Sequence, residues 1–181
     1  AVHAELVGSH PIADRDALAA AGAAAFTDDG RPVESAGLLR RALQYSAVAG
    51  RPLALHCEEP SLSRGGHAHE GAVSAELGLG AYPSQGESVM AGRDLALAAG
   101  EERPVHVMHL SARESVEHLA RARAQGVQAT GGVTPHHPVL TDEAVRSLDP
   151  NVKMNPPLRA EADRRALIDA LPRSPSGRRF D

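Results

Sequence analysis

The sequence predicts an α/β fold in which a parallel sheet forms part of a (β/α)8 TIM barrel, with about four βα units present. Short apolar runs alternate with amphipathic helical patterns, and no Asn-Gly hairpin signal separates the runs. Such alternation indicates parallel strands joined by helices. A complete barrel needs roughly 250 residues, whereas this chain has 181. The sequence therefore predicts about half of a barrel.

Strands and helices alternate along the first half of the chain. In order, we expect a strand tail at 5–9, a helix at 14–21, a strand at 23–30, a helix at 34–49 and a strand at 51–59. The helix at 34–49 has the clearest pattern, because Leu38, Leu39, Ala42 and Leu43 recur at helical spacing and Gly50 follows as a stop signal.

The second half opens with a loop at 57–71, which is rich in turn formers and should lie over the active face. The elements expected after it are helices at 72–79 and 88–99, a strand at 104–109, a helix at 114–125, a strand at 127–133 and a helix at 161–171. Gly100 and Gly126 are the expected stop signals of two of these helices. We expect one partial-barrel domain over 1–171 and an irregular tail over 172–181, either non-native or disordered.

Composition argues against several classes of function. The 19 basic residues and 23 acidic residues nearly balance, so nothing indicates a nucleic-acid footprint or a membrane-surface patch. The sequence has neither an apolar run of about 20 residues nor a basic-then-apolar leader, so we expect no membrane span and no signal peptide. The single cysteine, Cys57, fits a reducing cytoplasm.

Three of the predicted strands end in side chains that bind metals. Asp29, His56 and His109 each stand at the carboxyl end of a different strand. Because the carboxyl ends of parallel strands meet on one face, we expect these side chains to converge. A catalytic zinc usually takes three ligands of this kind and keeps a fourth position open for water. The sequence therefore predicts a metal site made by these three residues.

The strand at 104–109 carries two histidines, of which only one can point into the mouth of a barrel. Alternation puts Val105, Val107 and His109 on one face of the strand and His106 on the other. We therefore assign the metal-binding role to His109.

Four further histidines invite other interpretations. His67 and His69 could form a rival metal pair, but glycines flank them and no apolar run precedes them, which favours a polar loop. His136 and His137 follow a strand and fit equally well a place in the pocket or a purely structural role.

A proline-rich stretch near the end of the chain carries two groups that could bind a substrate carboxylate. These are the amide of Asn155 and the guanidinium of Arg159. Alternatively, Arg159 only pairs with a nearby acid.

Six short motifs follow one another along nearly the whole chain, at 26–30, 56–59, 65–71, 109–111, 134–137 and 155–159. In this order and at this spacing, they resemble a dihydroorotase of the bacterial type, within the amidohydrolase superfamily. Each motif is short, but together they are specific. The resemblance implies a metal-dependent amidohydrolase barrel that interconverts N-carbamoyl-L-aspartate and dihydroorotate in pyrimidine biosynthesis.

The resemblance also implies roles for individual residues. In the family, two zinc ions hold a bridging hydroxide that attacks the ring amide. Asp29 matches the carboxylate that bridges the metals, His56 and His109 match ligands of one zinc, and Asn155 matches a substrate-binding residue.

Other parts of the family pattern have no counterpart in these 181 residues. The His-x-His motif of the first strand, the arginine beyond it and the catalytic aspartate of the final strand are not found. At most one zinc is therefore well liganded, and the catalytic residue is unknown. We expect a truncated or frame-shifted copy, or a fragment of a longer protein, that is nearly inactive by itself.

Two alternative functions stay open. One is a non-catalytic dihydroorotase-like scaffold for aspartate transcarbamoylase, although a scaffold would not need the three metal ligands. The other is an allantoinase or hydantoinase acting on another cyclic amide, although Asn155 before the Pro-Pro-Leu-Arg run favours dihydroorotase. The sequence also leaves open a homo-oligomer, and manganese, cobalt or iron in place of zinc.

Overall fold

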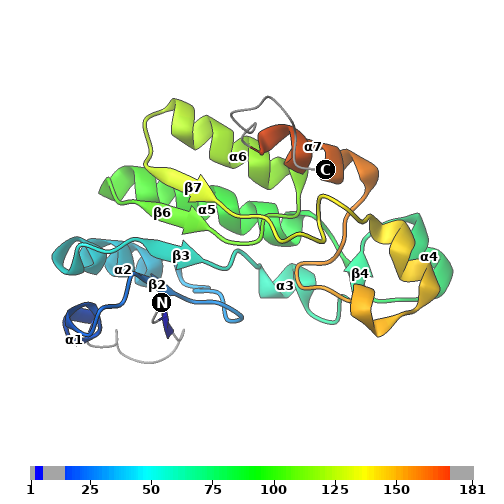
Figure 1. Ribbon diagram of the computed structural model, residues 1–181, viewed down its shortest axis with the longest axis horizontal. Helices are drawn as coiled ribbons and strands as arrows, with labels where there is room; N and C mark the ends of the chain where they lie inside the picture. The colour runs from blue at the N-terminus through cyan, green and yellow to red at the C-terminus, as the bar shows by residue number, and fades with distance from the viewer. Residues whose placement is uncertain (1–2, 6–14, 172–181) are drawn as a thin grey trace.

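The computed structural model describes residues 3–5 and 15–171, and its centre is a five-stranded parallel sheet (Figure 1). The strands lie in the order β1-β2-β3-β6-β7, and each pairs in parallel with its neighbours. Their bounds are β1 His3–Glu5, β2 Ala25–Thr27, β3 Leu53–Leu55, β6 Val105–Val107 and β7 Ala129–Gly131. The predicted parallel α/β architecture is therefore confirmed.

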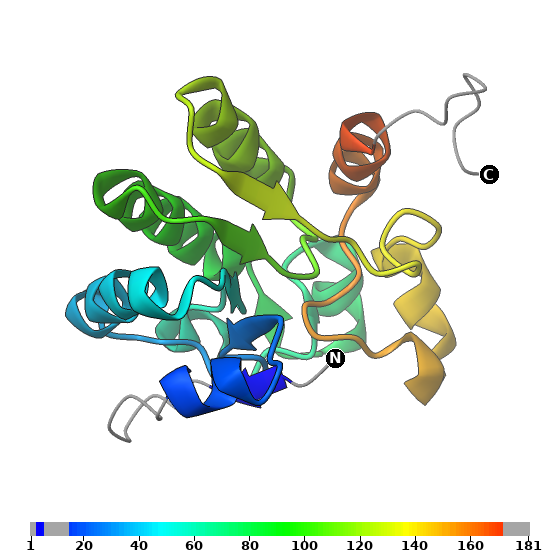
Figure 2. The same cartoon turned by 60° about the vertical axis from the view of Figure 1, so that its left-hand side comes forward.

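A helix follows each strand and packs on the outer side of the sheet. These helices are α1 Arg15–Ala20, α2 Ala36–Ala49, α5 Gln85–Glu101, α6 Arg113–Ala124 and α7 Glu161–Ala170. Figure 2 shows them as an arc around the strands. An arc of strands with helices outside is the arrangement of a barrel wall, here present in part.

The core lies between the sheet and this arc of helices. Phe26 and Leu53 from the strands meet Leu39 and Leu43 from α2, and all four side chains are almost fully buried. Full burial of one such side chain stabilises the fold by about 1.5–3 kcal/mol. Because the chain is poor in aromatic residues, small and branched aliphatic side chains fill most of this layer.

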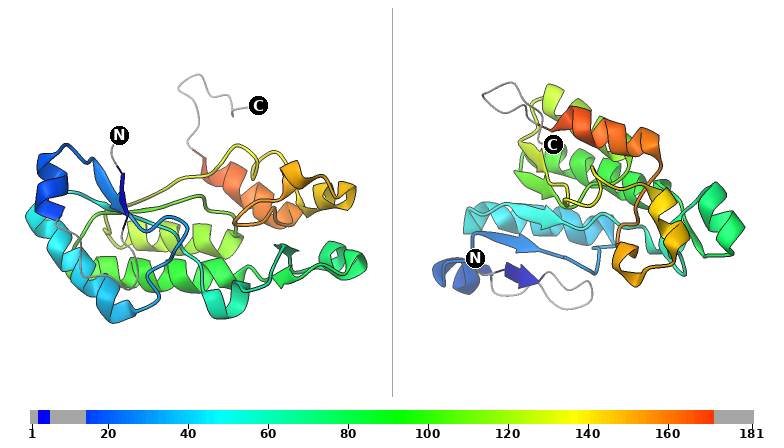
Figure 3. Two further views of the ribbon diagram at one scale, coloured as in Figure 1. Left: turned by 90° about the horizontal axis from the view of Figure 1, so that it is seen from below. Right: turned by 45° about the vertical axis from the view of Figure 1, so that its right-hand side comes forward.

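The stretch between β3 and α5 corrects the predicted loop at 57–71. It contains α3 Pro60–Ser63, β4 Ala68–His69, α4 Ala72–Leu77 and β5 Ala81–Tyr82, with β4 and β5 paired in a small parallel sheet. A side chain at Gly80 would collide with the carbonyl oxygen of Gly65, so glycine permits this close approach. Figure 3 shows the extension on the side to which the large strands point.

Two 3-10 helices also lie where the sequence predicted no regular structure. They are η1 Asp142–Ser147 and η2 Pro150–Val152. The Asp149 side chain begins η2 by accepting a hydrogen bond from the backbone N–H of Asn151 at 2.9 Å.

Most predicted boundaries hold within a few residues, but those of α5 and β6 differ. Helix α5 begins at Gln85 and runs through Gly100, so the predicted stop at that glycine is wrong; Glu102 ends the helix in the left-handed conformation, with φ of 52°. Strand β6 ends at Val107 rather than at residue 109. Of the strand tail predicted at 5–9, only Glu5 lies within the described residues, and the tail at 172–181 lies outside them. The assignment of 1–171 to one domain stays a prediction.

A buried polar group links α5 to the rest of the core. Asp94 is 2% exposed, accepts a 2.7 Å hydrogen bond from Arg93 Nε and lies 3.6 Å from the thiol of Cys57. Arg93 in turn donates to the carbonyl oxygens of Val33 and Glu34, each at 2.7 Å. Burial raises the pKa of Asp94 to about 6, against the opposing effect of Arg93.

We expect an Asp94→Asn substitution to change the pH dependence of stability. The pKa of Asp94 is raised from 3.8 to about 6 on folding, so between these pH values the folded state binds a proton that the unfolded state has lost. The free energy of unfolding therefore falls as pH rises from about 4 through 6. The variant should therefore gain stability relative to the wild type between pH 4.5 and 7.5, by about 2 kcal/mol. Urea denaturation at both pH values measures the difference. Glu117→Gln, on an exposed part of α6, is the control, and a constant difference for Asp94→Asn would contradict the burial argument.

Candidate metal centre

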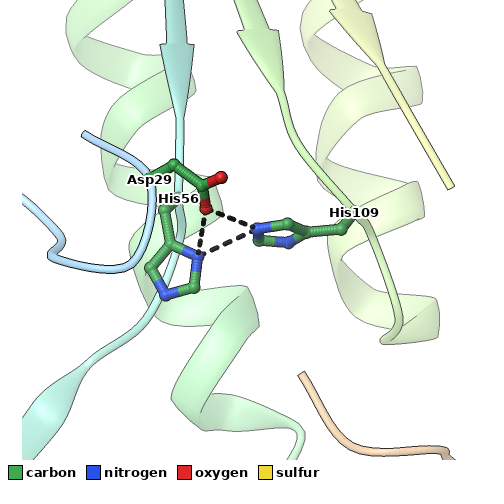
Figure 4. A group of neighbouring side chains, drawn as sticks. All are labelled: Asp29, His56 and His109. Carbon is green, nitrogen blue, oxygen red and sulfur yellow. Dashed lines mark hydrogen bonds and ion pairs between the residues drawn. The ribbon is translucent and has the colours of Figure 1, made fainter. Parts of the chain in front are cut away.

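Asp29, His56 and His109 lie together at the carboxyl ends of three neighbouring strands, β2, β3 and β6 (Figure 4). Asp29 Oδ1 lies 3.9 Å from His56 Nδ1 and 3.6 Å from His109 Nε2. The two imidazole nitrogens are 2.9 Å apart. The convergence expected for these residues is therefore present. Among the described residues, these three form the group of acidic, histidine or cysteine side chains that lie close enough to share a metal ion.

The three donor atoms fit one metal ion. A tetrahedral zinc with bonds of about 2.0–2.1 Å separates its ligand atoms by roughly 3.3 Å, and the observed distances of 2.9, 3.6 and 3.9 Å lie on either side of that value. The imidazoles of His56 and His109 are 3% and 18% exposed, whereas the Asp29 carboxylate is 62% exposed. The open side next to Asp29 leaves room for a further ligand.

Asp28 positions the first two of these residues without facing the site itself. Its buried carboxylate accepts hydrogen bonds from the backbone N–H of His56 at 2.7 Å and of Val33 at 3.1 Å. It thereby ties the end of β2 to the end of β3. Burial raises the pKa of Asp28, partly offset by these hydrogen bonds. The sequence showed two adjacent carboxylates, but not that one is buried as an acceptor while the other is exposed at the site.

His109 reaches the site through a change of backbone direction that strand alternation does not predict. It lies two residues beyond β6 and has φ of 34°, in the left-handed region that few non-glycine residues adopt. The predicted continuation of one strand face through Val105, Val107 and His109 is therefore wrong, although both valines are buried. His106 instead lies within the strand and pairs with Thr130 Oγ1 at 2.8 Å. Burial, and to a lesser extent His56, lower the pKa of His109, which favours the neutral ring that binds metal.

Glu87 holds the chain just beyond His109. Its carboxylate, from α5, accepts hydrogen bonds from the backbone N–H groups of Ser111 and Ala112 at 3.1 Å and from the Ser111 hydroxyl. Ala112 is the N-cap of α6 and has no side chain to cap it, so Glu87 supplies the acceptor from another helix. Sequence analysis missed this residue, because 24 residues separate it from Ser111.

Arg159 serves the same internal network rather than the open site. It is 2% exposed, donates to Ser111 Oγ at 3.0 Å and to the carbonyl oxygen of Tyr82 at 2.8 Å, and lies 3.9 Å from Glu87. Its guanidinium also lies over the Tyr82 ring, 4.8 Å from the centroid. Arg159 therefore lies near an acid, as the alternative predicted, but its hydrogen bonds go to Ser111 and Tyr82.

Asn155 lies close to the metal-ligand candidates and is exposed. Its amide donates to Glu58 Oε2 at 3.1 Å, and the same oxygen lies 2.8 Å from His56 Nε2. The hydrogen bond with His56, with smaller effects of Ser63 and Asn155, lowers the pKa of Glu58 to about 2 despite partial burial. Glu58 was missed as a functional candidate, although it stands two residues after His56.

The other histidines that the sequence offered as alternatives, His67, His69 and His137, do not join this group. His137 is buried and bonds Thr134 Oγ1 at 2.7 Å and the carbonyl oxygen of Pro156 at 3.0 Å, which indicates the structural role. His69 belongs to β4 and lies 3.3 Å from Arg159 Nη1, so the predicted polar loop at 67–69 is wrong. His67 and Leu79 line a cavity of about 290 Å³ together with residues in and beside the two 3-10 helices.

We expect removal of either imidazole of the group to weaken cobalt binding by more than about 100-fold, since outer partners of a metal ligand alone are worth 10–100-fold. The test is a titration of the wild-type chain, His56→Ala and His109→Ala with Co²⁺, followed by visible absorbance. His106→Ala is the matched control, since this histidine lies three residues before His109 and belongs to the strand. If His106→Ala weakened binding as much as His109→Ala, the assignment of ligands would be wrong.

The sequence matches known proteins over most of its length. The family model described as dihydro-orotase-like matches residues 4–115. Curated dihydroorotases of Pelotomaculum thermopropionicum and Bacillus subtilis are 47% identical over 160 residues and 45% identical over 156 residues, which cover 88% and 86% of this chain. These matches cover 38% and 36% of the two relatives, so the chain spans little more than a third of their length.

The fold is similar to solved hydantoinases. A D-hydantoinase aligns with a TM-score of 0.70 and 24% identity, over 86% of this chain and 36% of its own. The L-hydantoinase (dihydropyrimidinase) from Arthrobacter aurescens aligns with a TM-score of 0.70 and 21% identity, over 84% of this chain and 36% of its own. At such identities the likeness concerns the fold alone. Because the dihydro-orotase-like family model matches more than half of the chain, the chain belongs to that family.

Proposed function

We propose that these residues belong to a dihydroorotase, a metal-dependent cyclic amidohydrolase that interconverts N-carbamoyl-L-aspartate and dihydroorotate in pyrimidine biosynthesis. The observation that carries the proposal is the convergence of Asp29, His56 and His109 at three strand ends, in a chain 42–47% identical to curated dihydroorotases. Zinc is the ion we propose, because two imidazoles and a carboxylate with an open side are typical of a catalytic zinc site.

Different residues of the chain would bind the metal ion and the substrate at this site. A bound ion would polarise the ring carbonyl and lower the pKa of water toward about 7. Asp29, His56 and His109 would hold that ion, and the exposed amide of Asn155 would hydrogen-bond the substrate beside it. Water has access from the side of Asp29, which is 62% exposed.

The proposal extends to surroundings and partners. We propose small-molecule substrates and a cytoplasmic location, which the single cysteine, Cys57, fits. Within the described residues, no helix is both long enough and apolar enough to span a bilayer. A homo-oligomer or a complex with aspartate transcarbamoylase remains part of the proposal.

We expect the purified 181-residue chain to turn over N-carbamoyl-L-aspartate at close to the background rate. The described residues offer one set of three ligands, whereas the family reaction uses two zinc ions and a catalytic aspartate. A coupled assay for dihydroorotate, with and without a chelator, measures this. Turnover that chelation abolishes would overturn the expectation.

A chimera tests the function in a complete barrel. The segment of the Bacillus subtilis dihydroorotase that aligns with this chain is replaced by the chain's own residues, and formation of dihydroorotate is assayed. We expect activity, and a fall in kcat/KM of about tenfold or more for Asn155→Ala, the range expected for loss of one substrate hydrogen bond to a charged group.

Asn151→Ala is the control for the chimera, because Asn151 is an exposed asparagine bonded to Asp149 in η2. Equal effects of the two substitutions would remove Asn155 from the substrate site. A folded, zinc-loaded chimera that hydrolyses hydantoins but not dihydroorotate would favour the hydantoinase alternative.

A further inference from the structure

We propose that Glu58 is a positioning residue that joins the metal-binding and substrate-binding sides of this site. Its carboxylate orients the ring of His56 and holds the side chain of Asn155 through the same oxygen atom. This inference rests on the proposed function, because it assigns Glu58 a role toward the ion and the substrate named there.

The contact between Glu58 and His56 determines which ring nitrogen of His56 has a lone pair available to bind a metal ion. His56 Nδ1 is the atom that faces Asp29 and His109, whereas Nε2 lies 2.8 Å from Glu58 Oε2. A carboxylate can only accept a hydrogen bond, so Nε2 carries the proton. Nδ1 then presents its lone pair toward the other two ligands, which is the tautomer that metal binding through Nδ1 requires.

The second contact connects the substrate side. Asn155 Nδ2 donates to the same oxygen, Glu58 Oε2, at 3.1 Å. His56 and Asn155, 99 positions apart in the sequence, thus share one acceptor atom. A shift of the His56 ring when an ion binds would move that oxygen, and Asn155 would follow.

Helix α3 holds the carboxylate in this orientation. Ser63, at its end and almost fully buried, donates to the other oxygen, Glu58 Oε1, at 2.6 Å. The helix itself begins at Pro60, with Glu59 as N-cap accepting from the Ser61 backbone N–H at 3.1 Å. Glu58 therefore has a fixed support, and α3, which the sequence did not predict, has a function in the site.

Glu59 provides a matched control. It neighbours Glu58 and carries the same charge, but its carboxylate accepts hydrogen bonds from the backbone N–H and the hydroxyl of Ser61. Glu59→Gln therefore reproduces the loss of charge near a divalent ion, keeps an oxygen that can accept from the Ser61 N–H at the start of α3, and removes no contact to His56.

The test uses the full 181-residue chain and two measurements that do not depend on activity. Zinc affinity is measured by competition with a chromophoric chelator, and the tautomer of His56 by ¹⁵N NMR of the metal-free chain. For Glu58→Ala, which removes the acceptor altogether, we expect a 10–100-fold loss of zinc affinity and a loss of the pure Nε2–H form. For Glu59→Gln we expect a change of less than about twofold and an unaltered tautomer.

The link to Asn155 has its own readout. Zinc should shift the side-chain amide resonances of Asn155 in the wild-type chain, and this shift should disappear in Glu58→Ala. Equal losses of zinc affinity in Glu58→Ala and Glu59→Gln, or an unchanged His56 tautomer in Glu58→Ala, would overturn the proposal. If these signatures hold while the chimera fails to act on carbamoyl-aspartate, the proposed function fails and the positioning role stands.

Discussion

The parallel register of β2, β3 and β6 is the constraint on which the site depends. Thr27 pairs with Ala54, and Leu55 pairs with Val107, so the three strands end at one level of the sheet. The side chains that follow these ends are then brought within 4.8 Å of one another. Because the same edge of every parallel strand carries the polar termini, a metal site here needs only a ligand-bearing residue one or two positions beyond each strand.

Four carboxylates near this edge of the sheet have different partners, and they differ in how far they are buried. Asp29 is exposed and faces the two imidazoles. Asp28 binds the backbone of His56, Glu58 its ring, and Glu87 the segment after His109. Each of the latter three accepts several hydrogen bonds, which offsets the cost of removing a charge from water. The two histidines are therefore held by buried or half-buried carboxylates, while the solvent-exposed side of the site lies at Asp29.

Part of the fold and of the metal site could be predicted from short-range patterns in the sequence. The helical spacing in α2 and the apolar runs before Asp29 and His56 are local signals, and both proved reliable. Other features depend on partners distant in sequence. The pairing of β4 with β5 involves two residues on each side, too few for any periodicity, and the support of the His109 segment by Glu87 comes from a different helix. The left-handed backbone at His109 has no signal in a non-glycine residue.

The most direct test of the account is the zinc content of the purified chain, measured by elemental analysis beside a variant in which Asp29, His56 and His109 are all alanine. Convergence of these residues on one ion predicts about one zinc per wild-type chain and none in the variant. No zinc in either protein, or the same amount in both, would contradict the claim that these three strand ends form a metal site in this chain.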